Sequence, residues 1–404
     1  MRLAAQRIQP DRPGRKIFFV FLRSQLLAIL QLLGVCLWGL PLLAQTATTG
    51  ASHSFLLHYA EKNVSLSSVI NAGKQEVKFR KEPAFGKDQV LRRALQIGPN
   101  KNDFIGFAVD LTRRTLYLDL NQNLDLTDDP DGVYQGQGGR AYASFANVRL
   151  NLRKNGVVRS YLLDPFYFYG RGDAGYIAVK SSYQGEIELY GQKYWVEVQD
   201  NLDGVVNRQD QFSIAVSAEA GRAGYRPMPV ATKLFLSGHQ YQLNFTFEAG
   251  PGVSPLIANV TEISSPLGEL VIDGQFIRRL VLEGDAGLAI LDSPTQPIFL
   301  PVGKYFVQAV YLQSALSKPA LTSNVSRMPQ FSVTAGTPYH LRVGGPLESS
   351  VTATASGNFL KLSYVLKGVG DEQYSVSNQN SGKPPGIAIY QGDRQLAAGN
   401  FQFG

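Results

Sequence analysis

Two short stretches of the chain concentrate oxygen-bearing side chains of the kind that hard cations bind. "DLNQNLDLTDDPDG" (119–132) holds five aspartates and two asparagines in fourteen positions, directly after the apolar "LYL". "QDNLDGVVNRQD" (199–210) is the second stretch. Ca²⁺ takes six to eight oxygen ligands, and alternate positions of a tight loop can all turn toward one ion. The spacing therefore predicts a calcium loop in each stretch.

The first loop fits a twelve-residue calcium frame that begins at residue 119. Position 6 of this frame is Leu124 rather than glycine, and position 12 is Pro130, which has no carboxylate. An aspartate at residue 128, 129 or 131 must therefore close the site. The candidate ligands in this loop are Asp119, Asn121, Asn123, Asp125 and Asp128.

The second loop fits the same frame from residue 199, with Gly204 at position 6 and the carbonyl of Val205 at position 7. Its first ligand is a neutral glutamine and its last an aspartate rather than a longer glutamate, so weak binding is expected. The candidate ligands in this loop are Gln199, Asn201, Asp203, Asn207 and Asp210.

A second interpretation needs no metal. Asn and Asp are common turn residues, because their side chains bond to nearby backbone and tolerate left-handed conformations. Both stretches are therefore either calcium loops or turns rich in these residues.

The segments that must position these loops are strands. Apolar residues alternate in "TLYLDL" (115–120), and hairpins are expected in "EIELYGQKYWVEV", with a turn at Gly191-Gln192, and in "IAIYQGDRQLAAG", with a turn at Gly392-Asp393. Period-2 alternation with glycine, asparagine and aspartate between the strands is typical of sandwiches and barrels. One stretch, "DQVLRRALQI" (88–97), has a helix-like pattern. The prediction is an all-β, multidomain protein with β-sandwich or Ig-like modules and a larger β-rich N-terminal domain.

Breaks rich in proline and glycine place the domain boundaries. "EAGPGVSP" (248–255) ends a β-rich N-terminal domain (45–255) that contains both loops. An Ig-like sandwich (256–345) and a small C-terminal β unit (346–404) are expected to follow.

The two loops resemble the D-x-N-x-N-x-D and x-D-N-x-D-G loops of dockerin-like and EF-hand-like calcium repeats, and of secreted bacterial all-β proteins. "IFLPVGKYFVQAV" resembles the P-x-G-x-Y turn and strand of carboxypeptidase-regulatory and prealbumin-like sandwiches, through Pro301, Gly303 and Tyr305. The resemblance implies calcium as a cofactor and an accessory sandwich without enzymatic activity.

The N-terminus has the layout of a secretory signal peptide. A basic lead precedes the apolar run "LLAILQLLGVCLWGLPLLA", and cleavage is expected after Ala44. The alternative is an uncleaved membrane anchor, which would be the one reason to expect a membrane partner. Cleavage predicts a secreted, periplasmic or cell-envelope protein.

Removal of the leader also changes the charge and cysteine content. Six of the 39 basic residues and one of the 32 acidic residues lie in residues 1–44, so the mature charge is +2 rather than +7. This small charge gives no reason to expect a nucleic-acid partner. The single cysteine, Cys36, leaves with the leader, which excludes disulfides and thiol catalysis.

Three classes of function remain. The first is a non-enzymatic binding or structural protein that meets a glycan or a cell-surface protein. The second is a glycan-active hydrolase, which needs two carboxyl groups at a defined separation. The third is a carbohydrate-binding module that uses the aromatic residues of "DPFYFYGRGDAGY" (164–176).

Overall fold

The computed structural model describes residues 50–401, except residues 67, 73–74, 86–89, 140, 169–174, 219–224, 314–320, 325–327, 358 and 377–385. These residues form mainly strands and turns, together with the three-residue 3-10 turn η1 (Pro130–Gly132). The predicted all-β class is confirmed. In this part of the chain no helix is long and apolar enough to cross a bilayer. The predicted leader, residues 1–44, lies outside the described residues.

The helix-like pattern of residues 88–97 was misleading, because this segment forms β3 (Val90–Gln96). Leu91 and Leu95 pack into a cluster on one face of the sheet, whereas Val90 and Ala94 pack into a second cluster. A strand that is covered on both faces places apolar residues three and four positions apart, and it therefore imitates a helix.

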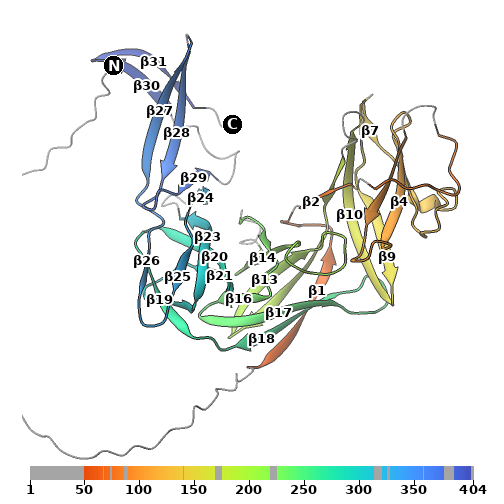
Figure 1. Cartoon of the computed structure of the whole chain (residues 1–404), viewed down its shortest axis with the longest axis horizontal. Coiled ribbons are helices and arrows are strands. Elements are labelled where there is room, and N and C mark those ends of the chain that lie inside the picture. The colour runs from red at the N-terminus through yellow and green to blue at the C-terminus, as the bar shows by residue number, and fades with distance from the viewer. Residues whose placement is uncertain are drawn as a thin grey trace, which may run out of the picture. The chain divides into compact units, whose positions relative to one another are not determined.

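Two sheets build the N-terminal part of the fold. The first sheet is formed by β3, β4 (Phe104–Asp110), β5 (Thr115–Leu118) and β6 (Val133–Gln135). The second is formed by β2 (Ser68–Asn71), β11 (Gly175–Val179), β10 (Val157–Phe168), β8 (Tyr142–Ser144) and β7 (Gln137–Gly138), with β9 (Val148–Lys154) also paired to β10. Phe107 of the first sheet and Tyr161 of the second belong to one buried cluster, so the sheets share a core (Figure 1). The first loop leaves β5 and reaches β6 through η1.

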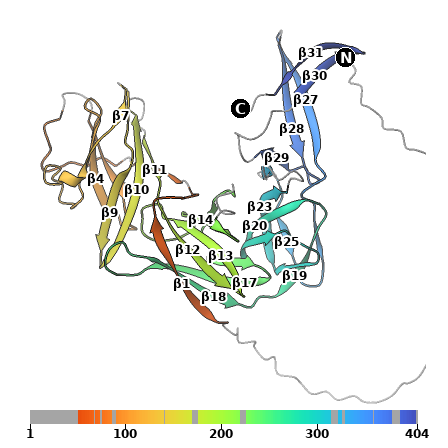
Figure 2. The same ribbon diagram turned by 180° about the vertical axis from the view of Figure 1, so that it is seen from behind.

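A larger sheet contains β1 and extends into strands of the C-terminal half of the chain. In order, its strands are β15 (Met228–Pro229), β14 (Gln211–Ala215), β13 (Gln192–Gln199), β12 (Ser182–Leu189), β1 (Ser52–Ala60), β18 (Leu256–Ile263), β17 (His239–Phe247), β16 (Lys233–Leu236), β21 (Gly287–Asp292), β20 (Ile277–Gly284), β23 (Gly303–Leu312), β24 (Leu321–Asn324), β29 (Gln373–Val376), β28 (Phe359–Lys367) and β27 (Glu348–Ser356), with β25 (Phe331–Val333) also paired to β23. Inward-facing residues of β1, β12 to β14 and β16 to β18 form one core. Figure 2 shows β1, β12, β13, β17 and β18 as neighbouring strands of this sheet. The second loop joins β13 to β14. Residues 248–255 connect β17 and β18, which are paired neighbours in this sheet. The domain boundary expected at residues 248–255 stays a prediction.

A three-stranded sheet packs against the C-terminal half of the larger one. Its strands are β22 (Ile298–Pro301), β19 (Leu267–Ile272) and β26 (Tyr339–Leu341). Leu270 and Leu300 from this sheet share a buried cluster with Leu282 of β20. The P-x-G-x-Y residues lie at the turn between β22 and β23, where the buried Tyr305 donates its hydroxyl hydrogen to the Pro301 carbonyl at 2.7 Å.

The last two strands belong to a separate unit. β30 (Gly386–Gln391) and β31 (Arg394–Asn400) form an antiparallel hairpin with its turn at Gly392 and Asp393, as the sequence predicts. Contacts group this hairpin apart from residues 47–382.

Candidate metal centre

Asp119 organises the first loop from a buried position. Only 1% of its surface is exposed, and it follows the last residue of β5. Its Oδ1 accepts a hydrogen bond from the Asn123 N–H at 3.0 Å, and its Oδ2 accepts one from the Leu124 N–H at 3.1 Å. Burial raises the pKa of Asp119 and the nearby Asp128 charge adds to the rise, whereas the two N–H groups act in the opposite direction.

Two asparagines hold Asp128 beside this turn. Asn123 Nδ2 donates to Asp128 Oδ2 at 2.7 Å, and Asn121 Nδ2 donates to Asp128 Oδ1 at 3.3 Å. The amide oxygens of Asn121 and Asn123 accept the N–H groups of Asn123 and Asp125 at 3.1 and 2.6 Å. The structure therefore brings four of the five predicted residues of this loop into one network.

Asp125, the fifth predicted residue, is engaged differently. Its Oδ1 accepts bonds from the Thr127 N–H at 2.8 Å and from the Thr127 hydroxyl at 2.6 Å. Its Oδ2 lies 3.6 Å from Lys81 Nζ. The Thr127 hydrogen bonds and then the Lys81 charge lower the pKa of Asp125. Its side chain has local partners, so its backbone carbonyl is the atom that the calcium frame would use at position 7.

Asp129 carries the one unsatisfied atom of this loop. The residue is 8% exposed, and its Oδ2 is buried without a hydrogen-bond partner. Burial raises the pKa of Asp129, and the charges of Asp119 and Asp128 raise it further, whereas backbone N–H groups of Asn121 and Leu120 near this carboxyl group oppose the rise. A buried carboxylate oxygen without a donor is costly unless a cation or a proton reaches it. The sequence named residue 129 as one of three aspartates able to close the site, but its burial could not be read from the spacing.

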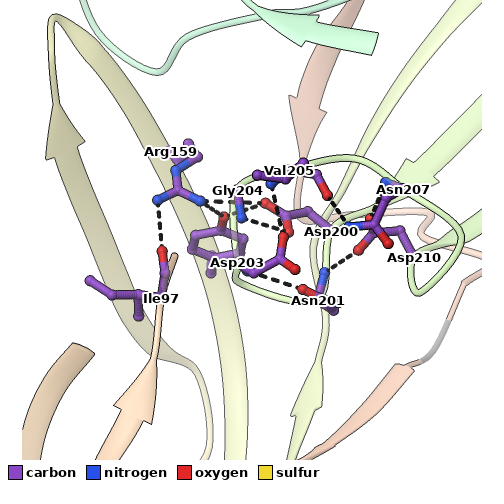
Figure 3. A network of polar contacts seen from close by, with 10 residues as sticks. Ile97, Arg159, Asp200, Asn201, Asp203, Gly204, Val205, Asn207 and Asp210 are labelled. Carbon is purple, nitrogen blue, oxygen red and sulfur yellow. Dashed lines mark hydrogen bonds and ion pairs between the residues drawn. The ribbon is translucent and has the colours of Figure 1, made fainter. Parts of the chain in front are cut away.

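In the second loop, four of the five predicted residues lie together (Figure 3). The two oxygens of Asp210 accept the N–H groups of Asn201 and Asn207 at 2.7 and 2.6 Å. Asn201 Oδ1 accepts the Asp203 N–H at 3.0 Å, and Asp203 Oδ1 accepts the Val205 N–H at 2.8 Å. Burial, followed by the charges of Asp200 and Asp203, raises the pKa of Asp210 to about 7.

The structure does not bring Gln199, the fifth residue, to these ligands. It ends β13 and is 1% exposed. Its Nε2 donates to the carbonyls of Val179 and Ser181 at 3.2 and 2.9 Å, and its Oε1 accepts the Ser68 N–H at 2.7 Å. Three backbone groups thus use the amide of Gln199.

The neighbouring Asp200, which the sequence pattern missed, anchors the second loop instead. Its Oδ2 accepts the Tyr161 hydroxyl hydrogen at 2.5 Å and lies 3.8 Å from Arg159 Nη1, while its Oδ1 accepts the Gly204 N–H at 3.2 Å (Figure 3). Arg159 Nη2 donates to the Ile97 carbonyl at 3.0 Å. Burial raises the pKa of Asp200, while the Tyr161 hydrogen bond and the Arg159 charge oppose that rise. Arg159 therefore supplies the positive charge beside the buried carboxylate of the second loop.

The ligand atoms of the two loops limit which metal ions could bind there. Among the described residues, no three His, Cys, Asp or Glu side chains form a ready-made metal cluster. A cation in the first loop would therefore need amide and backbone carbonyl oxygens beside the carboxylates, as Ca²⁺ accepts. The unpartnered Asp129 Oδ2 fits such an ion, and soft metals that prefer thiolate or imidazole have no ligands in either loop.

Comparison of the chain with protein-family models, with curated proteins and with solved structures gives no match. Function must therefore be argued from the sites themselves rather than from relatives.

Proposed function

We propose that this chain is a secreted or cell-envelope binding or structural protein, without enzymatic activity, whose β-rich N-terminal part is stabilised by calcium. The observation that carries the proposal is the buried Asp129 Oδ2, which has no hydrogen-bond partner and lies in the field of Asp119 and Asp128. The described contacts of these three carboxylates include no lysine or arginine. An external cation would offset their repulsion.

Calcium suits the first loop better than other common cations. Asp129 supplies the free carboxylate oxygen, and Asp119 and Asp128 would supply further ones after turning from their present donors. Asn121 and Asn123 would supply amide oxygens, and residue 125 a backbone carbonyl. Mg²⁺ is smaller and demands near-ideal octahedral geometry, whereas Ca²⁺ tolerates six to eight oxygens in an irregular loop. Binding requires the amides of Asn121 and Asn123 to turn their oxygens toward the ion, because their NH₂ groups now face Asp128.

The second loop is proposed as a weaker calcium site. Both oxygens of Asp210 already accept backbone N–H groups, and Arg159 supplies a positive charge to Asp200. Asn201, Asp203 and Asn207 remain as ligands that an ion could share with those hydrogen bonds. We therefore expect most of the response to calcium to come from the first loop.

The C-terminal modules fit the role of spacers or binding modules. The core that β19, β22 and β26 share with β20 and β23 supports an Ig-like or prealbumin-like sandwich in residues 256–345. The Tyr305–Pro301 hydrogen bond supports the same assignment, since it explains the P-x-G-x-Y spacing. The partner of these modules is proposed to be a glycan or a cell-surface protein, and the leader is proposed to direct export.

One observation favours the alternative of a carbohydrate-binding module. Tyr142, Phe168 and Tyr176 are 39–43% exposed and gather around Phe166 on one face of β8, β10 and β11. Phe166 lies between Tyr142 and Tyr176, with centroid separations of 5.4 and 5.1 Å and interplanar angles of 8° and 5°. The rings thus cover one another's faces, which leaves fewer faces free for sugar rings than the sequence suggests.

The proposal is tested by thermal unfolding of the mature chain with millimolar CaCl₂ and with EGTA. Calcium should raise the melting temperature, and MgCl₂ at the same concentration should raise it less. Equal melting temperatures in CaCl₂ and EGTA, together with no heat of binding in calorimetry, would leave the loops as turns without a metal.

A further inference from the structure

A second site lies where β1 separates from β12. β1 pairs with β18 from Ser52 to Leu57, but it pairs with β12 only from His58 to Ala60. The first half of β1 and the end of β12 therefore diverge. A cavity of about 510 Å³ opens between them, and His53, Phe55, Glu188, Tyr190, Tyr241 and Glu262 are among its lining residues.

The inward positions of β17 and β18 become polar at this opening. Along β18, Ala258 and Val260 belong to the buried core, and the next inward residue is Glu262. Along β17, Tyr241 belongs to the core and the next inward residue is His239. The alternation of the two strands predicts apolar side chains at positions 239 and 262. A polar residue at a core-facing position is a stronger sign of a functional site than an exposed apolar residue is. Glu262 and His239 therefore indicate a binding site at this end of the core.

Tyr190 is held over this opening by an uncommon turn. It shares the β12–β13 turn with Gly191, at φ of 50° and 73°, so the turn lies one residue earlier than the sequence predicts. Such turns favour Asn, Asp or Gly at both positions, because they need positive φ. A tyrosine there is strained, and strained residues gather at ligand sites.

Two side chains, Glu262 and His239, contact the Tyr190 side chain. Its hydroxyl donates to Glu262 Oε2, and its ring stacks on His239 with a centroid separation of 3.6 Å. His239 Nδ1 lies 3.0 Å from Glu262 Oε1. The Tyr190 hydrogen bond, followed by that of His239, lowers the pKa of Glu262. Even so, 62% of Tyr190 stays exposed, so the ring stacks on His239 with one face and leaves the other accessible to a ligand.

The lining chemistry selects a class of ligand. None of the described residues that line this cavity is lysine or arginine, so the lining has no permanent positive charge for phosphate, sulfate or uronate groups. Both oxygens of Glu262 already have donors, which leaves Glu188 as the exposed carboxylate at the rim. Cavities of about 300–1,000 Å³ fit drug-sized ligands, and a single ammonium group would fill little of this one.

We propose that this cavity binds a neutral oligosaccharide, with one pyranose ring stacked on Tyr190 and its hydroxyl groups donating to Glu188. A pyranose has an apolar C–H face and ring hydroxyls, and it therefore matches an aromatic face beside an acceptor. No residue of either candidate calcium loop lines this cavity, so glycan binding should be independent of calcium in the first loop.

The test begins with a glycan array that carries neutral, acidic and amine-bearing oligosaccharides, probed with the mature chain in CaCl₂ and in EGTA. The strongest neutral glycan is then titrated by calorimetry. Tyr190→Ala should weaken binding at least tenfold, and Glu188→Gln should weaken it several-fold. Both side chains are exposed, and equal melting temperatures of the variants will confirm that they fold.

Tyr390→Ala is the matched control, because Tyr390 is also an exposed tyrosine and lies in the β30–β31 hairpin, outside both aromatic clusters. It should bind like the wild type. The proposal is overturned if no neutral glycan binds, or if Tyr190→Ala binds as tightly as Tyr390→Ala. Binding of spermidine but of no neutral glycan would assign the cavity to cations instead. The EGTA arm separates this site from the calcium loops, since glycan binding should persist when calcium is removed.

Discussion

The guanidinium of Arg159 on β10 lies 3.8 Å from the buried carboxylate of Asp200 at the start of the second loop. Asp129 in the first loop has no such partner in the described structure, and one of its oxygens is unsatisfied. The two loops have similar sequences but differ in the source of positive charge. The second takes it from the protein, and the first is proposed to take it from calcium.

Replacement of Arg159 should destabilise the protein even when no calcium is present. Arg159→Met leaves Asp200 buried without its cation, and loss of one partner of a buried ion pair costs about 3–5 kcal/mol. Urea unfolding in EGTA measures this loss. Arg149→Met is the matched control, because the Arg149 side chain is 60% exposed, and exposed pairs contribute about 0–1 kcal/mol. Equal losses for the two variants would contradict a structural role for the Arg159–Asp200 pair.

Gly204 should not accept a side chain. Its φ is +72°, and a Cβ would lie 1.5 Å from Arg159 Nη1. Gly204→Ala should therefore cost more than the roughly 1–2 kcal/mol of a left-handed alanine alone. Gly238→Ala supplies the comparison, since Gly238 has a φ of +85° and nothing lies within 4 Å of its Cβ position. Urea unfolding should show the larger loss for Gly204→Ala, and similar losses would mean that Arg159 moves aside freely.

The sequence predicts the strands better than it predicts the partners of polar residues. Leu116 and Leu118 are buried as the alternation requires, and the turn at Gly392 and Asp393 is correct. Spacing alone placed Gln199 in a metal frame, because it could not show that β13 extends to this residue and that the amide of Gln199 bonds the Ser68 N–H. Such contacts depend on register between distant strands.

The same limit applies to the second site. Glu262 and His239 are 23 residues apart in sequence, and they meet only because β17 and β18 pair in one register. Tyr190 reaches them from the turn of a second strand pair, β12 and β13. Local sequence spacing does not predict such a site. The one local signal is a tyrosine beside the glycine of a tight hairpin, where Asn, Asp or Gly is usual.

Acid should weaken the Tyr190–Glu262–His239 cluster. Hydrogen bonds from Tyr190 and His239 lower the pKa of Glu262 in the folded protein. A lowered folded pKa contributes stability above the unfolded value of about 4.3, and this contribution is lost as the pH falls through the folded value. Glu262→Gln should therefore melt below the wild type at pH 7, and the difference should shrink as the pH falls below about 4. A difference that is constant from pH 7 to pH 3 would contradict the ionised state of Glu262.

Export should remove the leader. Edman sequencing of the protein recovered from a periplasmic or culture fraction is expected to begin near Gln45, by the signal-peptide pattern. Retention of Met1 on exported protein would support the membrane-anchor alternative instead.

The calcium response of Asp129→Asn tests the central proposal most directly. Wild-type stability should rise by RT ln(1 + [Ca²⁺]/Kd), about 2.7 kcal/mol at a hundredfold excess over Kd. The loop has no closing glutamate, and affinity on the order of 10⁻⁴–10⁻³ M is expected. Asp129→Asn should lose most of the melting shift between EGTA and CaCl₂, while Asp131→Asn, an exposed aspartate two residues away, should keep it. A full calcium shift in Asp129→Asn would contradict the proposed site.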